Sequence, residues 1–184
     1  PCQSLMDTTV ASVHGKKYTL EEKIGEGRSS VVFRAYNVQD TIKDHPFAIK
    51  VFRKPKSSQV RHEISQLIWI NNSNVVDFID HSYEGGYIVM EFVPQSLYDL
   101  VKKNEVTQQV MTDYILQIPY LLALLWEKRI AHCDLKTSNL GYANRTIKAL
   151  DFGLAIPLRQ TVFRHVDKVP PYNAPEFRLG GLVT

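Results

Sequence analysis

The hydrophobic pattern of the first half of the chain predicts short strands and one helix. Five runs have the composition and alternation of strands: Tyr18–Ile24, Val31–Tyr36, Phe47–Phe52, Val75–His81 and Tyr87–Phe92. After the third run, apolar residues recur at helical spacing: Val60, Ile64, Leu67 and Ile68. We therefore expect an antiparallel sheet of five strands, with a helix over Ser57–Asn71 inserted after the third strand.

After Pro94 the pattern becomes typical of helices. Ser96–Lys103 predicts a short helix, and Val110–Lys128 a long one that Pro119 should kink or interrupt. Short strand-like runs return later: Ile130–His132, Leu140–Ala143 and Ile147–Leu150, the last two joined by a turn at Asn144-Arg145. The predicted fold class is α+β, with a β-rich part over residues 18–93 and a mainly helical part over residues 94–184.

Composition narrows the class of protein. The chain has 184 residues, 44% hydrophobic and 22% charged, which is typical of a globular chain and excludes an intrinsically disordered one. The net charge of +3 is spread along the sequence and gives no reason to expect nucleic acid as a partner. The longest apolar run, Tyr120–Trp126, is too short to cross a membrane. We expect a monomer without a membrane span.

Cysteine content and the start of the chain suggest a compartment. Cys2 and Cys133 are the two cysteines, too few for a disulfide framework or a four-ligand metal site. Pro1–Leu5 has neither the basic nor the apolar part of a secretory signal. We expect a cytoplasmic protein and treat residues 1–17 as an N-terminal extension or a cloning remnant.

Three features of the β-rich part are candidates for a functional site, and each also has an ordinary structural explanation. Gly25 and Gly27 stand between the first two strands, where backbone N–H groups can approach phosphate oxygens, although such a turn is more often only a turn. Lys50 lies on the third strand and could be a plain exposed lysine. Glu63 lies beside the apolar stripe of the helix, either in solvent or turned inward as a partner of Lys50.

The second half of the sequence contains further motifs, which together with these three features form an ordered set. His132-Cys133-Asp134-Leu135-Lys136-Thr137-Ser138-Asn139 is followed by Asp151-Phe152-Gly153 and then by Ala174-Pro175-Glu176. Together with the Gly turn, the strand lysine and the helix glutamate, these motifs stand in the order found in protein kinases. From Tyr18 to Glu176 the chain resembles the protein kinase superfamily, which implies a two-lobed fold.

The resemblance implies a role for each polar residue. Lys50 would hold the α- and β-phosphates of ATP and be oriented by Glu63, with Gly25, Gly27 and Ser30 in the loop above the phosphates. Asp134 would orient the substrate hydroxyl, with Lys136 near the γ-phosphate. Asn139 and Asp151 would hold Mg²⁺, with Mn²⁺ as an alternative. Lys136, two residues after Asp134, resembles the serine/threonine rather than the tyrosine kinase pattern.

The same resemblance implies an adenine pocket. Val32, Ala48 and Leu140 would sandwich the base, Met90 would stand at the back, and Glu91 and Val93 would offer backbone groups to its edge. These residues are also suited to an ordinary core, and the two interpretations are compatible because a ligand completes the core.

The chain departs from the kinase pattern at several points. Cys133 replaces the arginine that reads a phosphate on the activation loop, so switching by loop phosphorylation is not expected. Between Gly153 and Ala174, Thr161 and Tyr172 carry the hydroxyl groups. Val169 replaces a threonine, and Ser30 the third glycine of the loop.

The small size suggests a narrower hypothesis. Glu176 is followed by eight residues, so we expect either a truncated chain or a minimal kinase, and in size the chain resembles bacterial type III secreted effectors of the OspG-like and HopBF-like kinds. This resemblance implies secretion into a host cytosol and a host protein substrate, with a cytosolic heat-shock chaperone as the HopBF-like case. Two alternatives stay open: a pseudokinase that only binds a partner, and a small-molecule kinase of the aminoglycoside phosphotransferase kind.

Overall fold

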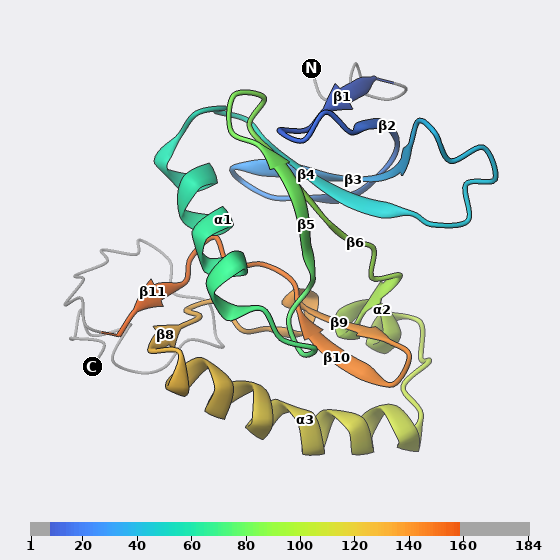
Figure 1. The fold of residues 1–184 in the computed structure, drawn as a ribbon. Helices are drawn as coiled ribbons and strands as arrows, with labels where there is room; N and C mark the ends of the chain where they lie inside the picture. Colours follow the sequence, from blue (N-terminus) through green and yellow to red (C-terminus); the bar gives the residue numbers. More distant parts are fainter. Residues whose placement is uncertain (1–7, 159–184) are drawn as a thin grey trace. The chain divides into compact units, whose positions relative to one another are not determined.

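The computed structural model describes residues 8–158, which fall into two compact units (Figure 1). Unit 1 comprises Pro1–Asn71 and Val76–Val93, and unit 2 comprises Asn72–Val75 and Pro94–Thr184, as far as each is described. Each unit has its own hydrogen-bonded sheets, and residues 72–75 belong to the second although the chain around them belongs to the first.

Unit 1 is built on one antiparallel sheet of six strands in the order β1-β2-β3-β4-β6-β5. The strands are β1 Thr9–Ala11, β2 Lys17–Glu26, β3 Ser30–Asn37, β4 Phe47–Phe52, β5 Phe78–Ser82 and β6 Tyr87–Glu91. The expectation of five strands was wrong by one, because β1 is only three residues long, too short for a hydrophobic pattern to predict it. β1 pairs with β2 through residues that we assigned to an extension (Figure 1).

The sheet is curled, because the turn after β1 reaches the strand at the other end of the order. Val13 donates its N–H to the His81 carbonyl at 2.8 Å, and His14 Nδ1 lies 2.9 Å from Asp80 Oδ1. Asp80 is fully buried. Burial raises the pKa of this carboxyl, but the neighbouring Ser12 and His14 side chains and the hydrogen bond from the His81 N–H outweigh it and hold the pKa below its ordinary value.

Alternate residues of the strands form the core of unit 1, which consists of Tyr18, Leu20, Val31, Phe33, Ala35, Ile49, Tyr87 and Val89. Helix α1, Ser58–Ile70, turns one face inward and buries Val60, Glu63, Ile64, Leu67 and Ile70. Ile68 was expected on this face, but it is 56% exposed, and Ile70 takes the buried place. In the β5–β6 hairpin Gly86 has a φ of +69°, and an added Cβ would lie 2.5 Å from Pro55 Cα, so the turn requires glycine.

The described part of unit 2 contains two α-helices whose N-termini are capped. α2, Leu97–Lys102, begins with a capping box in which Ser96 and Asp99 exchange hydrogen bonds. α3, Gln108–Glu127, is capped by the Thr107 side chain and runs through Pro119 as one helix (Figure 1). The interruption expected at Pro119 therefore does not occur.

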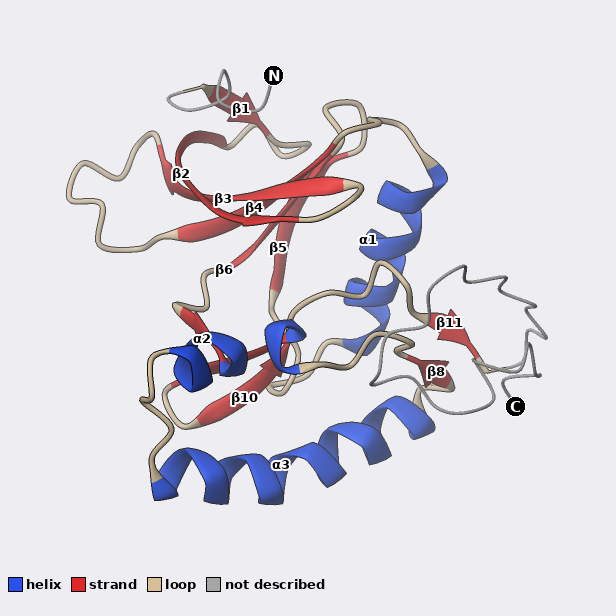
Figure 2. Ribbon diagram, turned by 180° about the vertical axis from the view of Figure 1, so that it is seen from behind, coloured by secondary structure: helices blue, strands red, loops and turns tan. Residues whose placement is uncertain are grey.

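Short strands make the described part of unit 2 less helical than expected. β9, Leu140–Ala143, pairs with β10, Thr146–Ala149, and with β7, Gln95–Ser96. β8, Ile130–Ala131, pairs with β11, Ile156–Pro157 (Figure 2). The turn between β9 and β10 has positive φ at both Asn144 and Arg145, as a tight hairpin turn requires. Among the described residues, no helix is long and apolar enough to cross a membrane.

Residues 72–75 anchor the hairpin of unit 2, which the sequence did not predict. The Asn74 side chain donates to the Ile147 carbonyl at 2.8 Å and to Gln117 Oε1 at 2.9 Å. The Asn74 carbonyl accepts from the Ala149 N–H at 2.9 Å. These bonds fix β10, and β10 leads directly to Asp151.

Candidate active site

In unit 1, Lys50 and Glu63 form a buried ion pair. Lys50 Nζ lies 2.6 and 2.8 Å from the two carboxylate oxygens of Glu63, and the two side chains are 6% and 1% exposed. β4 and the inner face of α1 position them, so Glu63 is turned inward and is not a solvated helix residue. Two charges taken out of water at this depth are tolerated because each satisfies the other.

Gly25, near the end of β2, and Gly27, in the turn before β3, are glycines that the packing of the protein itself does not require. A Cβ added at Gly25 would lie no closer than 3.6 Å to Val32, and one added at Gly27 no closer than 3.8 Å to Ser30, both ordinary contacts. Neither glycine has a positive φ. Since neither packing nor backbone conformation demands glycine here, close approach of a ligand to the backbone is the remaining physical reason. Ser30 is buried and accepts the Gly27 N–H on its carbonyl at 2.9 Å.

The expected adenine-binding residues of unit 1 lie on adjacent strands. Ala48 of β4 stands opposite Met90 of β6, and Val32 of β3 stands opposite Lys50. Ala48 and Met90 are buried, and Val32 is half-buried. Glu91 ends β6 and donates its N–H to the Asp77 carbonyl at 3.0 Å, and half-buried Val93 is the last residue of the unit.

In unit 2, three predicted residues form one hydrogen-bonded cluster. Lys136 Nζ donates to Asp134 Oδ2 at 2.8 Å, and Asn139 Nδ2 donates to the same oxygen at 2.8 Å and to the Asp134 carbonyl at 2.9 Å. Asp134 is half-buried in the loop after β8, and Asn139 lies in the 3₁₀ turn η2, Thr137–Asn139. The cluster holds one carboxylate oxygen between two donors, which fixes the orientation of the Asp134 side chain.

The residues that flank Asp134 show how the loop is held. Cys133 has a φ of +63°, a left-handed conformation that is costly for a residue with a Cβ. The ring centroids of His132 and Phe152 lie 4.8 Å apart, and both residues are buried. Burial lowers the pKa of His132, against smaller raising effects of Asp151 and Asp134. His132 Nε2 is buried without a hydrogen-bond partner in the part of the chain described, which favours a neutral ring.

Asp151 lies just after β10, and a backbone hydrogen bond of its neighbour Leu150 links this segment to Asn139. Asp151 Oδ1 accepts the Gly153 N–H at 2.9 Å, and the Leu150 N–H donates to the Asn139 carbonyl at 3.0 Å. An amide oxygen and a carboxylate are hard ligands that suit Mg²⁺, and Asn139 uses its amide nitrogen on Asp134, which leaves its oxygen for a cation. The donor set therefore fits a magnesium ion. Within residues 8–158 no group of three His, Cys, Asp or Glu residues offers another metal site.

The remaining predicted residues are Leu140, which the structure describes, and a group beyond residue 158, which it does not. Leu140, the residue expected below the adenine, is buried at the start of β9 in unit 2. The Ala174-Pro175-Glu176 motif, Thr161, Val169 and Tyr172 lie beyond residue 158 and so outside the described residues.

Comparison with known proteins identifies the family. Residues 18–180 match the model of the protein kinase domain. The chain is 30% identical over 171 residues to a probable serine/threonine-protein kinase of Clostridium acetobutylicum, with 87% of this chain and 26% of that protein covered. It is 31% identical over 173 residues to human calcium/calmodulin-dependent protein kinase type IV, with 89% of this chain and 36% of that protein covered. The mouse protein of the same name gives 31% over 176 residues.

The chain belongs to the protein kinase domain family, and its relatives are named as protein kinases, the Clostridium protein as a probable serine/threonine-protein kinase. It spans between about a quarter and a little over a third of the length of these relatives.

Proposed function

We propose that this chain transfers the γ-phosphoryl group of ATP to serine or threonine side chains of a protein, with Mg²⁺ as the metal ion. The observation that carries the proposal is the cluster in which Lys136 and Asn139 both donate to Asp134 Oδ2. A carboxylate held in this way is a positioned acceptor for the proton of an attacking hydroxyl. A protein that only bound partners would have no chemical use for this arrangement.

The chain's own residues would bind and orient the reactants. Lys50, fixed by Glu63, presents a positive charge for the phosphates, and the backbone at Gly25 and Gly27 can approach them closely. Asn139 and Asp151 would hold the magnesium ion, which when bound neutralises charge on the phosphates. Asp134 orients the hydroxyl group, and Lys136 adds positive charge beside it. Phosphoryl transfer depends mainly on such positioning and charge stabilisation.

The test is transfer of label from ATP in the presence of Mg²⁺ to a mixture of acceptor proteins. Asp134→Asn and Lys50→Ala should each lower the rate by about 10²-fold or more, because each removes an acid–base or electrostatic contribution. Asp44→Asn, an exposed carboxylate in the loop between β3 and β4, is the matched control and should keep full activity. Equal rates in all four proteins would contradict the proposal, and label on a small molecule alone would favour the phosphotransferase alternative.

A narrower proposal concerns the biological setting. We propose on the resemblance to minimal effector kinases that the substrate is a host protein, with a cytosolic heat-shock chaperone as the first candidate, and that the protein acts in the host cytosol. Labelling of a eukaryotic lysate by the wild type and by Asp134→Asn tests it, since a chaperone substrate would appear as a band labelled by the wild type alone.

A further inference from the structure

The glycine turn, residues 25–29, joins β2 to β3 and is fastened to the residue that follows β4. That residue is Arg53, which stands three positions beyond Lys50. The Arg53 N–H donates to the Ser29 carbonyl at 2.8 Å, and the Arg53 guanidinium forms an ion pair with the Glu26 carboxylate. Glu26 ends β2 and Ser29 directly precedes β3, so Arg53 holds the glycine turn on both sides of Gly27.

The Glu26 carboxylate binds a second cation. Lys23 Nζ lies 2.9 Å from Glu26 Oε2, whereas Arg53 pairs with Oε1. Hydrogen bonds from Lys23 and Arg53 hold the pKa of Glu26 below its ordinary value. The three side chains are between 40% and 49% exposed, and exposed ion pairs add little to the stability of a fold. We therefore expect this network to fix the conformation of the glycine turn rather than to stabilise unit 1 as a whole.

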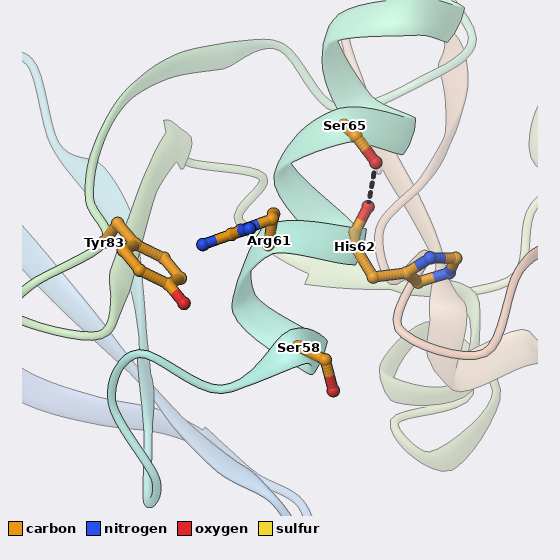
Figure 3. Close-up of a pocket in the computed structure, with 5 residues that line it drawn as sticks. All are labelled: Ser58, Arg61, His62, Ser65 and Tyr83. Atoms are coloured by element: carbon orange, nitrogen blue, oxygen red, sulfur yellow. Dashed lines mark hydrogen bonds between the residues drawn. The ribbon is translucent and has the colours of Figure 1, made fainter.

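The segment between β4 and α1, which carries the arginine, is itself bound at both ends to the β5–β6 hairpin. At its start the Phe52 N–H donates to the Gly86 carbonyl at 2.8 Å. Near its end the Lys56 carbonyl accepts the Tyr83 hydroxyl at 2.7 Å. Figure 3 shows the Arg61 side chain of α1 extending toward this tyrosine, and its guanidinium lies 4.8 Å from the ring centroid. The arginine is therefore a fixed anchor for the glycine turn.

We propose that Arg53 is a positioning residue for the phosphates of ATP, acting through Glu26 and Ser29. Glycines give a backbone wide conformational freedom, and a ligand that must order a mobile backbone loses affinity. Because the glycine turn is held against the end of β4, its backbone N–H groups are in place before the nucleotide binds. The strand that carries Lys50 then fixes both groups that would meet the phosphates. This role rests on the proposed function.

Binding of ATP with Mg²⁺ is compared with binding of adenosine, which has no phosphate, by isothermal titration calorimetry. Arg53→Gln and Glu26→Gln should each weaken ATP binding about fivefold and leave adenosine binding within about 1.5-fold of the wild type. The double variant should bind ATP no more weakly than the weaker single variant, because both changes remove the same contact. Once ATP is bound its phosphates hold the turn, so KM for ATP should rise while kcat stays within about twofold.

Arg34→Gln is the matched control. Arg34 on β3 and Glu22 on β2 stand opposite each other, with Arg34 Nη2 2.9 Å from Glu22 Oε2, and both are exposed. This ion pair joins the same two strands but does not involve the glycine turn. Its loss should leave ATP and adenosine binding within about 1.5-fold of the wild type.

Glu26→Gln separates positioning of the turn from simple attraction between Arg53 and the phosphates. If charge alone set the affinity, removing a negative charge beside the phosphates would strengthen ATP binding. Loss of the contact that holds the turn weakens it instead. Tighter ATP binding by Glu26→Gln, or equal losses of affinity for ATP and adenosine, would overturn the proposal.

Amide hydrogen exchange of residues 25–29 without nucleotide measures the turn itself. Exchange should be at least about threefold faster in Arg53→Gln and Glu26→Gln than in the wild type and in Arg34→Gln. Unchanged exchange in Arg53→Gln would show that the arginine does not hold the turn. A wild type that binds neither ATP nor adenosine would refute the proposed function and this role with it, whereas equal ATP binding by the wild type and both variants would overturn this role alone.

Discussion

The ion pair of Lys50 and Glu63 lies almost wholly inside unit 1, and its two members depend on each other. We expect Lys50→Met and Glu63→Leu each to lower the free energy of unfolding by about 3–5 kcal/mol, because each leaves one buried charge without its partner. The double variant Lys50→Met/Glu63→Leu should regain most of this loss, since no charge is then left buried. Urea denaturation of the four proteins measures the coupling, and losses that simply add in the double variant would contradict it.

The buried imidazole of His132 makes stability depend on pH. Burial lowers the pKa of His132, so the unfolded state binds a proton more readily than the folded state does. The free energy of unfolding should therefore fall as the pH drops below about 6.5, by at most about 1.4 kcal/mol per pH unit from this residue. Asp80, Asp99 and Asp113 also have lowered pKa values, but their contribution is lost only below about pH 4.

Urea midpoints at pH 7.5 and pH 5.0 for the wild type and His132→Phe measure this effect. The phenylalanine keeps a ring against Phe152 and cannot take up a proton. The other histidines are present in both proteins, so the difference between the two pH slopes isolates His132. An identical slope in the variant would show that protonation of His132 does not differ between the folded and unfolded states.

At the scale of the helix, α3 tolerates a proline that its local energetics oppose. Pro119 lies inside Gln108–Glu127 and is exposed, so replacing it with alanine leaves no cavity. In a helix interior, proline lowers the free energy of unfolding by about 3 kcal/mol relative to alanine. Proline also restricts the unfolded chain, which raises the free energy of unfolding by up to about 1 kcal/mol. We expect Pro119→Ala to raise the free energy of unfolding by about 2 kcal/mol.

Ala123→Pro, an exposed position one turn later, is the matched control and should lower the free energy of unfolding by about 3 kcal/mol. Chemical denaturation of both variants makes the comparison. A loss of stability in Pro119→Ala would contradict the prediction that proline is unfavourable at this position.

The elements differ in how far sequence could predict them. β3 and β4 were predicted almost to the residue, because both are apolar, β-rich runs bounded by polar turn or loop residues, and β3 also alternates in burial. β1 was missed because three residues are too few for a pattern. Periodicity also left Glu63 undecided, since a residue at the edge of the apolar stripe can face either way. Its burial depends on Lys50, which lies on a different element.

At the scale of the whole chain, the sequence predicted the grouping of the kinase motifs but not that residues 72–75 belong to unit 2. Asp134, Lys136 and Asn139 were predicted as one group from their spacing within a kinase motif, and they share hydrogen bonds. Asn74 carried no signal, because its function depends on the carbonyl of Ile147, 73 residues away. Such long-range backbone contacts follow from the fold and have no local pattern.

The last prediction concerns the whole molecule and its nucleotide. If ATP and Mg²⁺ bind to the folded state, ATP at about 100 times its dissociation constant should add about 2.7 kcal/mol to the free energy of unfolding. For a chain of 184 residues this corresponds to a rise in melting temperature of about 5–10 °C. If Asp151 supplies a carboxylate for the metal, Asp151→Asn should lose the part of the rise that requires Mg²⁺, whereas Asp44→Asn should keep it. Thermal unfolding with ATP alone, with Mg²⁺ alone and with both separates the contributions, and an equal rise for Asp151→Asn and the wild type would show that the metal is held elsewhere.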